Sequence, residues 1–338
     1  MNIYSDYFEV IKDAVRADQS GIFPKGLAGV GNLSESSKMT FSTINNKISR
    51  KELAPSLKHY SEVAGLGKVN YNQDLGLHPD FGHLKATDNT EEHYIISCFV
   101  DIAGSTNMFK KFSKEAVFLI TNTLVKANIH TALIHGGYVQ RIQGDGLFIY
   151  FGGKNISKET AVKNALLSLS TYSYFVQNDL KDYLLSQGVE NISIRSGIDF
   201  GEADDVLWGS CGIDGISEVT TCSLHTSLAS KMQSSANKCG IVAGANVKNL
   251  VPNSDDYFSV VSKRTGDEND RYIFRNPDEG FYYTQYDFNW DKFLKKQPNV
   301  TFDQNGKLNF RLPVSNAILN PLSLQPIAEL SKPYFINE

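Results

Sequence analysis

The order of apolar segments after residue 92 limits most strongly how this chain can fold. Short apolar runs of strand length alternate with longer segments that have the apolar spacing of a helix. In chain order these segments are HYIISCFVD, residues 114–135, YVQRI, LFIYF, residues 159–186 and NISIRSGIDFG. The resulting order β-α-β-β-α-β predicts an α+β fold of the ferredoxin-like type, with an antiparallel-rich open sheet and helices on one face.

Composition divides the chain into three regions. Residues 1–92 are rich in Ser, Asn, Gly and Lys, with one short helix expected over residues 7–16, and are predicted to form a partly extended N-terminal arm. Residues 93–275 carry the alternating pattern and form the predicted core. Residues 276–338 begin with the aromatic-rich stretch FYYTQYDFNWDKFLKKQP and then become polar. We expect this third region to be a C-terminal extension appended to the core.

Later elements of the core are expected from the same patterns. The segment SLHTSLASKMQSSA is predicted to form a helix. Short strands are predicted at IVAG, DYFSVVSK and residues 272–274.

The charge balance excludes some classes of partner. Lys and Arg number 33 against 37 Asp and Glu, which gives a net charge of -4, and no basic block interrupts the sequence. Nucleic acid is therefore not an expected partner. The apolar runs are far shorter than the roughly 20 residues of a spanning helix. No apolar segment follows the N-terminus as in a secretory signal, so we expect a cytoplasmic protein with no membrane partner.

Two aspartates occupy positions where their carboxylates could bind divalent cations. Asp101 ends an apolar strand in FVDIAGST, and Asp145 lies in the turn QGDG between two predicted hairpin strands. Considered singly, they fit a helix N-cap and an ordinary turn residue. If the hairpin pairs beside the first strand, however, both carboxylates reach one end of the sheet. There they would hold divalent cations about 3.5–4 Å apart, as in phosphoryl-transfer sites. Their hard oxygen ligands suit Mg²⁺ or Mn²⁺.

The segments FVDIAGST, RIQGDGLFIYF, IRSGIDFGEA and SLHTSLASKM resemble, in order and spacing, the signature segments of class III nucleotidyl cyclases. This resemblance covers residues 93–275 and implies the catalytic domain of that family. It also implies two divalent metal ions, Mn²⁺ or Mg²⁺, bound by Asp101, Asp145 and the backbone carbonyl of Ile102.

The same resemblance assigns the remaining site residues. The loop containing Gly104, Ser105 and Thr106 would hold the triphosphate through its N–H groups, with Lys263 as a further phosphate ligand. Ser227 and Lys231 stand where the family has an asparagine and an arginine that contact the ribose and the transition state. Lysine keeps the positive charge but loses the planar fork of arginine.

The base-reading positions differ from those of adenylyl cyclases. Arg141 replaces a lysine and Thr220 replaces an aspartate, so an adenine reader is not intact. Arginine offers only donors, which suit the carbonyl oxygens of uracil, while Thr220 offers an acceptor for the amino group of cytosine. Phe99, on the strand that ends in Asp101, is expected to pack against the base. Uracil and cytosine both remain open on these residues.

The whole chain resembles the pyrimidine cyclases of bacterial Pycsar antiphage systems. This similarity rests on the arm containing LGLHPDFGHL and on the tail YYTQYDFNWDKFLKK. It implies a second messenger that activates a separate effector and leads to abortive infection. The class III resemblance implies a homodimer, because sites of that family form between two domains and this chain has one catalytic unit; Asp101 and Asp145 would come from one protomer, and the partner would supply the residues named next. These are Arg141, Thr220, Ser227 and Lys231.

The leading hypothesis is therefore a nucleotide cyclase that converts UTP to 3′,5′-cyclic UMP and diphosphate, a lyase reaction. Cyclisation of CTP to cyclic CMP in the same defence role is the first alternative. A purine nucleotide cyclase and an inactive nucleotide-binding pseudocyclase are the further alternatives.

Overall fold

The computed structural model describes residues 3–24, 33–64, 66, 69, 71, 73–298, 300–304 and 308–310. Its α-helices are α1 (Ser5–Gln19), α2 (Glu35–Asn45), α3 (Pro55–Val63), α4 (Lys114–Ile134), α5 (Lys158–Tyr174), α6 (Lys181–Ser186), α7 (Leu224–Ser235), α8 (Ala245–Asn249), α9 (Ser262–Thr265) and α10 (Trp290–Lys295). Its strands are β1 (Glu91–Glu92), β2 (Ile95–Ala103), β3 (Tyr138–Gln143), β4 (Gly146–Phe151), β5 (Ser193–Gly201), β6 (Leu207–Ile213), β7 (Ile216–Cys222), β8 (Gly240–Gly244), β9 (Phe258–Val260), β10 (Tyr272–Asn276), β11 (Phe281–Phe288), β12 (Val300–Phe302) and β13 (Leu308–Phe310).

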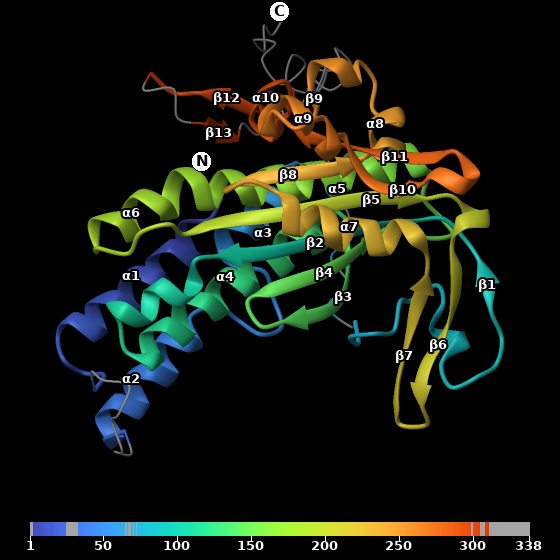
Figure 1. Cartoon of the computed structure of the whole chain (residues 1–338). Helices are drawn as coiled ribbons and strands as arrows, with labels where there is room; N and C mark the ends of the chain where they lie inside the picture. The colour runs from blue at the N-terminus through green and yellow to red at the C-terminus, as the bar shows by residue number, and fades with distance from the viewer. Residues whose placement is uncertain are drawn as a thin grey trace, which may run out of the picture.

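The main sheet has eight strands in the order β10-β11-β8-β5-β2-β4-β3, and β9 also pairs with β11 (Figure 1). All its pairs are antiparallel except β5 with β8. The four strands β5-β2-β4-β3, with α4 and α5 as their connections, have the ferredoxin-like order. The predicted α+β fold is therefore confirmed.

Helices cover both faces of this sheet rather than one. On one face, Ile96, Cys98, Val100 and Ile102 of β2 belong to the large apolar core shared with α4 and α5. On the other face, α7 crosses β5, β2 and β8. There Ser97 of β2 lies 2.9 Å, between hydroxyl oxygens, from a threonine of α7. Because side chains alternate along a strand, Phe99 and Asp101 share this second face with Ser97.

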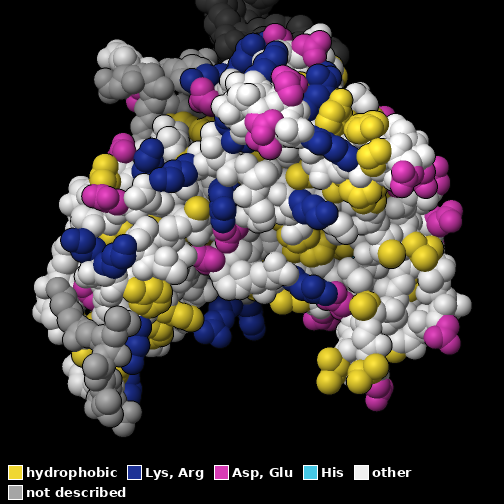
Figure 2. Space-filling view, viewed as in Figure 1, with side chains coloured by type: hydrophobic (Ala, Val, Ile, Leu, Met, Phe, Trp, Pro, Cys, Tyr) yellow, Lys and Arg dark blue, Asp and Glu magenta, His cyan; other side chains and the backbone are white. Residues whose placement is uncertain are grey.

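A second, three-stranded sheet consists of β1, β6 and β7. The β6–β7 hairpin stands away from the body of the protein (Figures 1 and 2). Ile213 and Ile216 at its tip are 75% and 80% exposed. Trp208 of β6 is instead fully buried and stacks on Phe81, with 4.0 Å between ring centroids.

The N-terminal region is more ordered than expected. The helix predicted over residues 7–16 is confirmed within α1, but the expectation of a partly extended arm missed α2 and α3. Tyr4 and Tyr7 explain the docking of α1, because they are fully buried and hydrogen-bond α4 through Thr131 and His130, each at 2.6 Å. Helix α4 is long and apolar enough to cross a bilayer by composition. Of its most apolar window 72% is buried inside the protein, which is the burial of a core helix.

The C-terminal region also joins the core. Residues from 276 were expected to form an appendage, yet β11 pairs with both β8 and β10 in the main sheet. Its Tyr283 and Phe288 are buried, and Trp290 of α10 donates to the carbonyl of Cys239 at 2.8 Å. The aromatic residues of β11 therefore belong to a strand of the main sheet, and Tyr283 and Phe288 are among its buried side chains. Residues 311–338 of the expected extension lie outside the described residues, and the boundaries at 92 and 275 stay predictions.

Candidate active site

The β3–β4 hairpin turn rests against the end of β2. Pairing of β4 with β2 runs up to Leu147 opposite Val100, which places the turn beside Asp101. A Cβ atom on Gly146 would lie 2.8 Å from the Val100 carbonyl oxygen and 3.6 Å from Cα of Asp101. Such close approach requires glycine here. The turn therefore brings Asp145 to the same sheet end as Asp101, as the sequence predicted.

Asp145 carries an unpaired acceptor at this sheet end. Its Oδ2 atom is buried and has no hydrogen-bond partner. Asp145 lines a hollow between the hairpin and the start of α4, together with Ser105 and Lys114. Because an unpaired buried carboxylate oxygen is costly, the site fits a cation ligand. Within the described part of the chain, no cluster of three or more His, Cys, Asp or Glu side chains is present, so two aspartates would need oxygen ligands from backbone and substrate.

Arg195 is the residue that sequence reasoning missed at this end. It lies opposite Asp101 in the β2–β5 register, and its Nη2 atom donates to Asp101 Oδ2 at 2.8 Å. Both side chains are about one-third exposed, at 34% and 33%. Arg195 is the one basic residue in the segment NISIRSGIDFG, and this was the available signal. The register that places it beside Asp101 could not be read from spacing.

The expected phosphate loop follows β2 directly. Gly104 has a φ of 84° and precedes a short 3-10 helix that begins at Ser105. The Gly104 carbonyl accepts from the N–H of Asn107 at 2.9 Å. Ser105 shares the hollow with Asp145, whereas Thr106 is exposed. The side chain of Ile102 points into the core, so only its backbone can reach the site.

Helix α7 presents the two expected transition-state residues on its outer face. Ser223 caps the helix by accepting from the N–H of His225 at 3.2 Å. Leu228 and Met232 are fully buried against the sheet side, whereas Ser227 and Lys231 are exposed one turn apart. These two side chains therefore face outward from the protomer.

Arg141 lies on β3 and Thr220 on β7, which belong to two different hairpins. Arg141 is not alone, because its Nε atom donates to Oε2 of Glu218 at 2.7 Å and its Nη2 atom pairs with Oε1 of the same carboxylate. Thr220 lies two residues after Glu218 on β7, so both side chains are on the same face of the strand. The Thr220 hydroxyl lies 3.4 Å from the Tyr150 hydroxyl. Glu218 is a second residue that the sequence reasoning missed, since no motif marks it.

Two expected ligands are less directly placed. Phe99 stacks on Phe148 with 4.2 Å between ring centroids and 9° between planes, so one of its faces is covered within the protomer. Lys263 is exposed on α9, beside Arg264, which forms a 2.8 Å ion pair with Asp287. The described contacts leave the predicted roles of Phe99 and Lys263 untested.

A buried polar network supports α7 from below. Asp199 of β5 is fully buried and lies 2.9 Å from Nδ1 of His225 on α7. Tyr283 of β11 donates to the other Asp199 oxygen at 2.8 Å. Burial raises the pKa of Asp199. Burial lowers the pKa of His225, but its hydrogen bond to Asp199 and the charge of that carboxylate more than compensate, so the net shift is upward.

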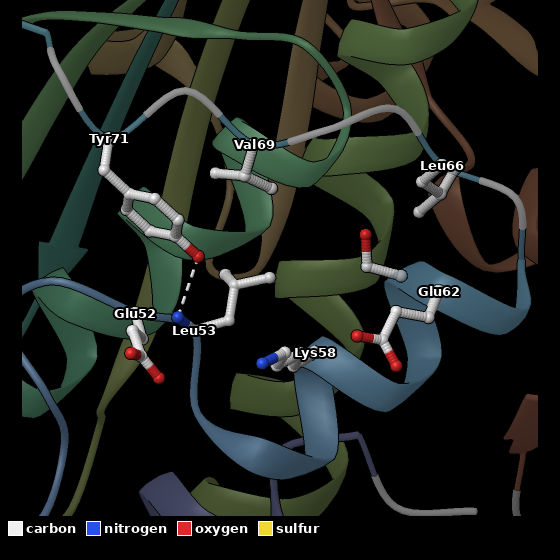
Figure 3. Close-up of a pocket in the computed structure, with 8 residues that line it drawn as sticks. Glu52, Leu53, Lys58, Glu62, Leu66, Val69 and Tyr71 are labelled. Carbon is white, nitrogen blue, oxygen red and sulfur yellow. Dashed lines mark hydrogen bonds between the residues drawn. The ribbon is translucent and has the colours of Figure 1, made fainter.

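A separate pocket lies among the N-terminal elements (Figure 3). Lys58 and Glu62 of α3 line it with Leu66 and Val69, and the Tyr71 hydroxyl accepts from the N–H of Leu53 at 2.7 Å. It contains none of the residues predicted for the active site.

The chain is similar in sequence to curated bacterial cyclases. It is 34% identical over 275 residues to a Staphylococcus aureus protein named cytidylate cyclase, covering 81% of this chain and 63% of that protein. It is also 34% identical over 266 residues to an Escherichia coli cytidylate cyclase, covering 75% and 57%. The chain is a homologue of proteins named cytidylate cyclase. This cyclase homologue spans about three fifths of the length of those relatives.

Other comparisons concern the cyclase fold. No family model matches the chain. Solved structures that match part of the chain include the adenylyl cyclase CyaB from P. aeruginosa, at 19% identity and a TM-score of 0.46, covering 59% of this chain and 95% of that one. The guanylyl cyclase Cya2 matches at 16% identity and the same TM-score, covering 59% and 92%. The resemblance to nucleotide cyclases expected from the four motifs is confirmed by the sequence relatives.

Proposed function

We propose that this chain is a pyrimidine nucleotide cyclase that converts CTP to 3′,5′-cyclic CMP and diphosphate. The carrying observation is the junction of β2 with the β3–β4 turn, which brings Asp145, with its buried, unpartnered carboxylate oxygen, to the sheet end that carries Asp101 and its partner Arg195. The names of the curated relatives favour CTP. UTP, expected first from Arg141 alone, is the second candidate.

The residues of the site match the needs of cyclisation. The ribose 3′-oxygen attacks the α-phosphorus in line, a new P–O bond forms, the bond to the diphosphate breaks, and the hydroxyl proton passes to solvent. Asp101, Asp145 and the carbonyl of Ile102 would hold divalent cations, Mn²⁺ or Mg²⁺. These cations would lower the pKa of that hydroxyl and neutralise charge on the phosphates. Arg195 adds a fixed positive charge beside Asp101. The loop from Gly104 to Thr106 and Lys263 would orient the triphosphate.

Completion of the site by a second copy is part of the proposal. The exposed outward position of Ser227 and Lys231 on α7 supports contact with a nucleotide held by the partner's aspartates. Lys231 would then stabilise charge that develops in the transition state. Exposed apolar side chains at the β6–β7 tip, Ile213 and Ile216, support a contact surface there. Two-fold symmetry would give two equivalent sites.

The biological role follows from the Pycsar resemblance. The cyclic nucleotide would act in the cytoplasm as a second messenger in antiphage defence, activating a separate effector that leads to abortive infection. The motif LGLHPDFGHL, whose Phe81 stacks on Trp208, carries part of that resemblance. Infection of cells that carry the chain with and without Asp101→Asn would test it through survival of the culture.

The activity itself is tested with four substrates. The purified chain is incubated with Mn²⁺ and ATP, GTP, CTP or UTP in separate tubes, and products are identified by mass spectrometry. We expect cyclic CMP as the main product, with none from Asp101→Asn. A purine product would refute the pyrimidine assignment, and no product with any substrate would favour the pseudocyclase alternative.

A further inference from the structure

The Arg141–Glu218 pair joins a half-exposed arginine to a mostly buried carboxylate. A hydrogen bond from Nε to Oε2 and an ion-pair contact between Nη2 and Oε1 join the guanidinium to the carboxylate, and the side chain of Glu218 is only 19% exposed. The two strands that carry them, β3 and β7, belong to different sheets. The pair therefore depends on whatever fixes these two strands relative to each other.

The segment around Gly76 fixes that spacing. The Gly76 N–H donates to the carbonyl of Gln140 at 2.9 Å, and the Gly76 carbonyl accepts from the N–H of Val219 at 2.7 Å. Gln140 also donates to the Val219 carbonyl through its side chain at 2.9 Å. Gly76 has a φ of 70°, and a Cβ there would lie 2.6 Å from Cβ of Glu218. Only glycine leaves room for Glu218 to reach Arg141.

The pair keeps hydrogen-bonding capacity toward solvent. Arg141 is 48% exposed, and its guanidinium carries five N–H groups, of which the contacts to Glu218 occupy a part. The two residues line one open hollow with Gly76, Gln140 and Ile216. The hollow thus offers a carboxylate acceptor and adjacent guanidinium donors side by side.

This order of groups matches one nucleobase. The pairing edge of cytosine presents a donor, N4–H, followed by two acceptors, N3 and O2. Carboxylates accept from cytosine N4, and arginine donates to two adjacent acceptors. Uracil presents acceptor, donor, acceptor, so the donors of Arg141 would meet N3–H. Adenine offers one edge acceptor beside its amino group, and guanine offers one acceptor followed by two donors.

We propose that Glu218, held by Arg141, is the residue that selects cytosine over uracil in the nucleotide bound at the partner's aspartates. This inference rests on the proposed function and deepens it. Thr220, expected from the sequence to supply the acceptor, is replaced in that role by the carboxylate two residues earlier on the same face of β7.

The substitution Glu218→Gln tests the assignment because it keeps the shape of the side chain. Arg141 would bind the amide oxygen, which leaves the amide NH₂ facing the base. That donor opposes cytosine N4–H and suits uracil O4. We expect the ratio of kcat/KM for CTP to that for UTP to fall at least about tenfold, which corresponds to one charged hydrogen bond. Glu218→Ala, as a second variant, should lower the ratio in the same direction.

The matched control is Glu35→Gln, which removes the same charge by the same substitution from α2, where the Glu35 side chain is 91% exposed. It should leave the ratio unchanged, and thermal unfolding confirms that each variant is folded. A wild type that prefers CTP, with a ratio unchanged within twofold in Glu218→Gln, would overturn this inference alone. A wild type that prefers UTP would also overturn it, while leaving a pyrimidine cyclase. A wild type without any product would overturn the proposed function together with it.

Discussion

Arg195 and Asp101 face each other across β5 and β2, with a guanidinium nitrogen 2.8 Å from a carboxylate oxygen. The pair places a positively charged guanidinium at the sheet end where the β3–β4 turn also positions Asp145. It balances one of the two carboxylates in the absence of substrate. If a triphosphate binds at this site as proposed, the same guanidinium would be available to its negative charge.

Replacing either aspartate should abolish turnover. Asp101→Asn and Asp145→Asn remove a cation ligand without opening a cavity, so we expect activity to fall at least about 100-fold while the melting temperature changes little. Product formation with Mn²⁺ and thermal unfolding measure the two effects. Near-normal activity of either variant would refute the two-metal site.

Removing Arg195 should strengthen the binding of Mn²⁺ and weaken the binding of the triphosphate. Arg195→Met deletes a positive charge that competes with a cation for Asp101, so Mn²⁺ should bind the nucleotide-free chain about fivefold more tightly. The KM for the triphosphate should rise, because the same charge no longer attracts it. Electron paramagnetic resonance of free Mn²⁺ and steady-state kinetics separate these results. Weaker Mn²⁺ binding would instead assign Arg195 to positioning Asp101.

Arg141 should govern the choice of base more than the need for metal. Arg141→Ala removes the donors to the base and leaves Asp101 and Asp145 intact, so selectivity among the four triphosphates should change while the Mn²⁺ dependence stays the same. Competition assays with mixed triphosphates measure the first property and a metal titration the second. An unchanged preference would show that Arg141 does not read the base.

A shared site should allow two inactive variants to restore each other. In a heterodimer of Asp101→Asn and Lys231→Ala protomers, one site carries both changes and the other carries neither. Random mixing of equal amounts should therefore give about a quarter of wild-type activity. The assay needs refolding or coexpression of two tagged chains. Activity no higher than that of the separate variants would place Lys231 and Asp101 in the same protomer.

Stability should peak near pH 6.5. Burial lowers the pKa of His78, His130 and His135 to about 4, so their stabilising effect is complete above about pH 6.5 and is lost as pH falls toward 4. His225 has the opposite shift, and its contribution is lost as pH rises above about 6.5 through its raised pKa. Urea unfolding across pH 4–9 measures both limbs.

Substitution of His135 tests most directly why stability falls at low pH. Both ring nitrogens are buried without a hydrogen-bond partner. His135→Leu should raise stability by about 1–3 kcal/mol at pH 5 and flatten the acid limb, because no unpaired polar group and no titrating ring remain. An acid limb as steep as in the wild type would assign it to other groups.

The sequence by itself determined the order of elements and the pair of aspartates. Apolar runs of strand length and helical spacing are local properties, so β2, α4, β3, β4 and β5 appear close to their predicted bounds. The strand-end and turn positions of Asp101 and Asp145 follow from the same local pattern. Their convergence follows once β4 pairs with β2.

Tertiary structure alone decided which residues complete the site. The pairing of Arg195 with Asp101 depends on the antiparallel register of β2 and β5, and a shift of one residue would turn the side chain to the other face. The pairing of Arg141 with Glu218 depends on a contact between two sheets, bridged by Gly76 from a segment 64 residues earlier than the Gln140 it binds. The two-residue alternation of side chains along a strand predicts which face each side chain occupies. Only packing between distant segments determines which charged side chains come into contact.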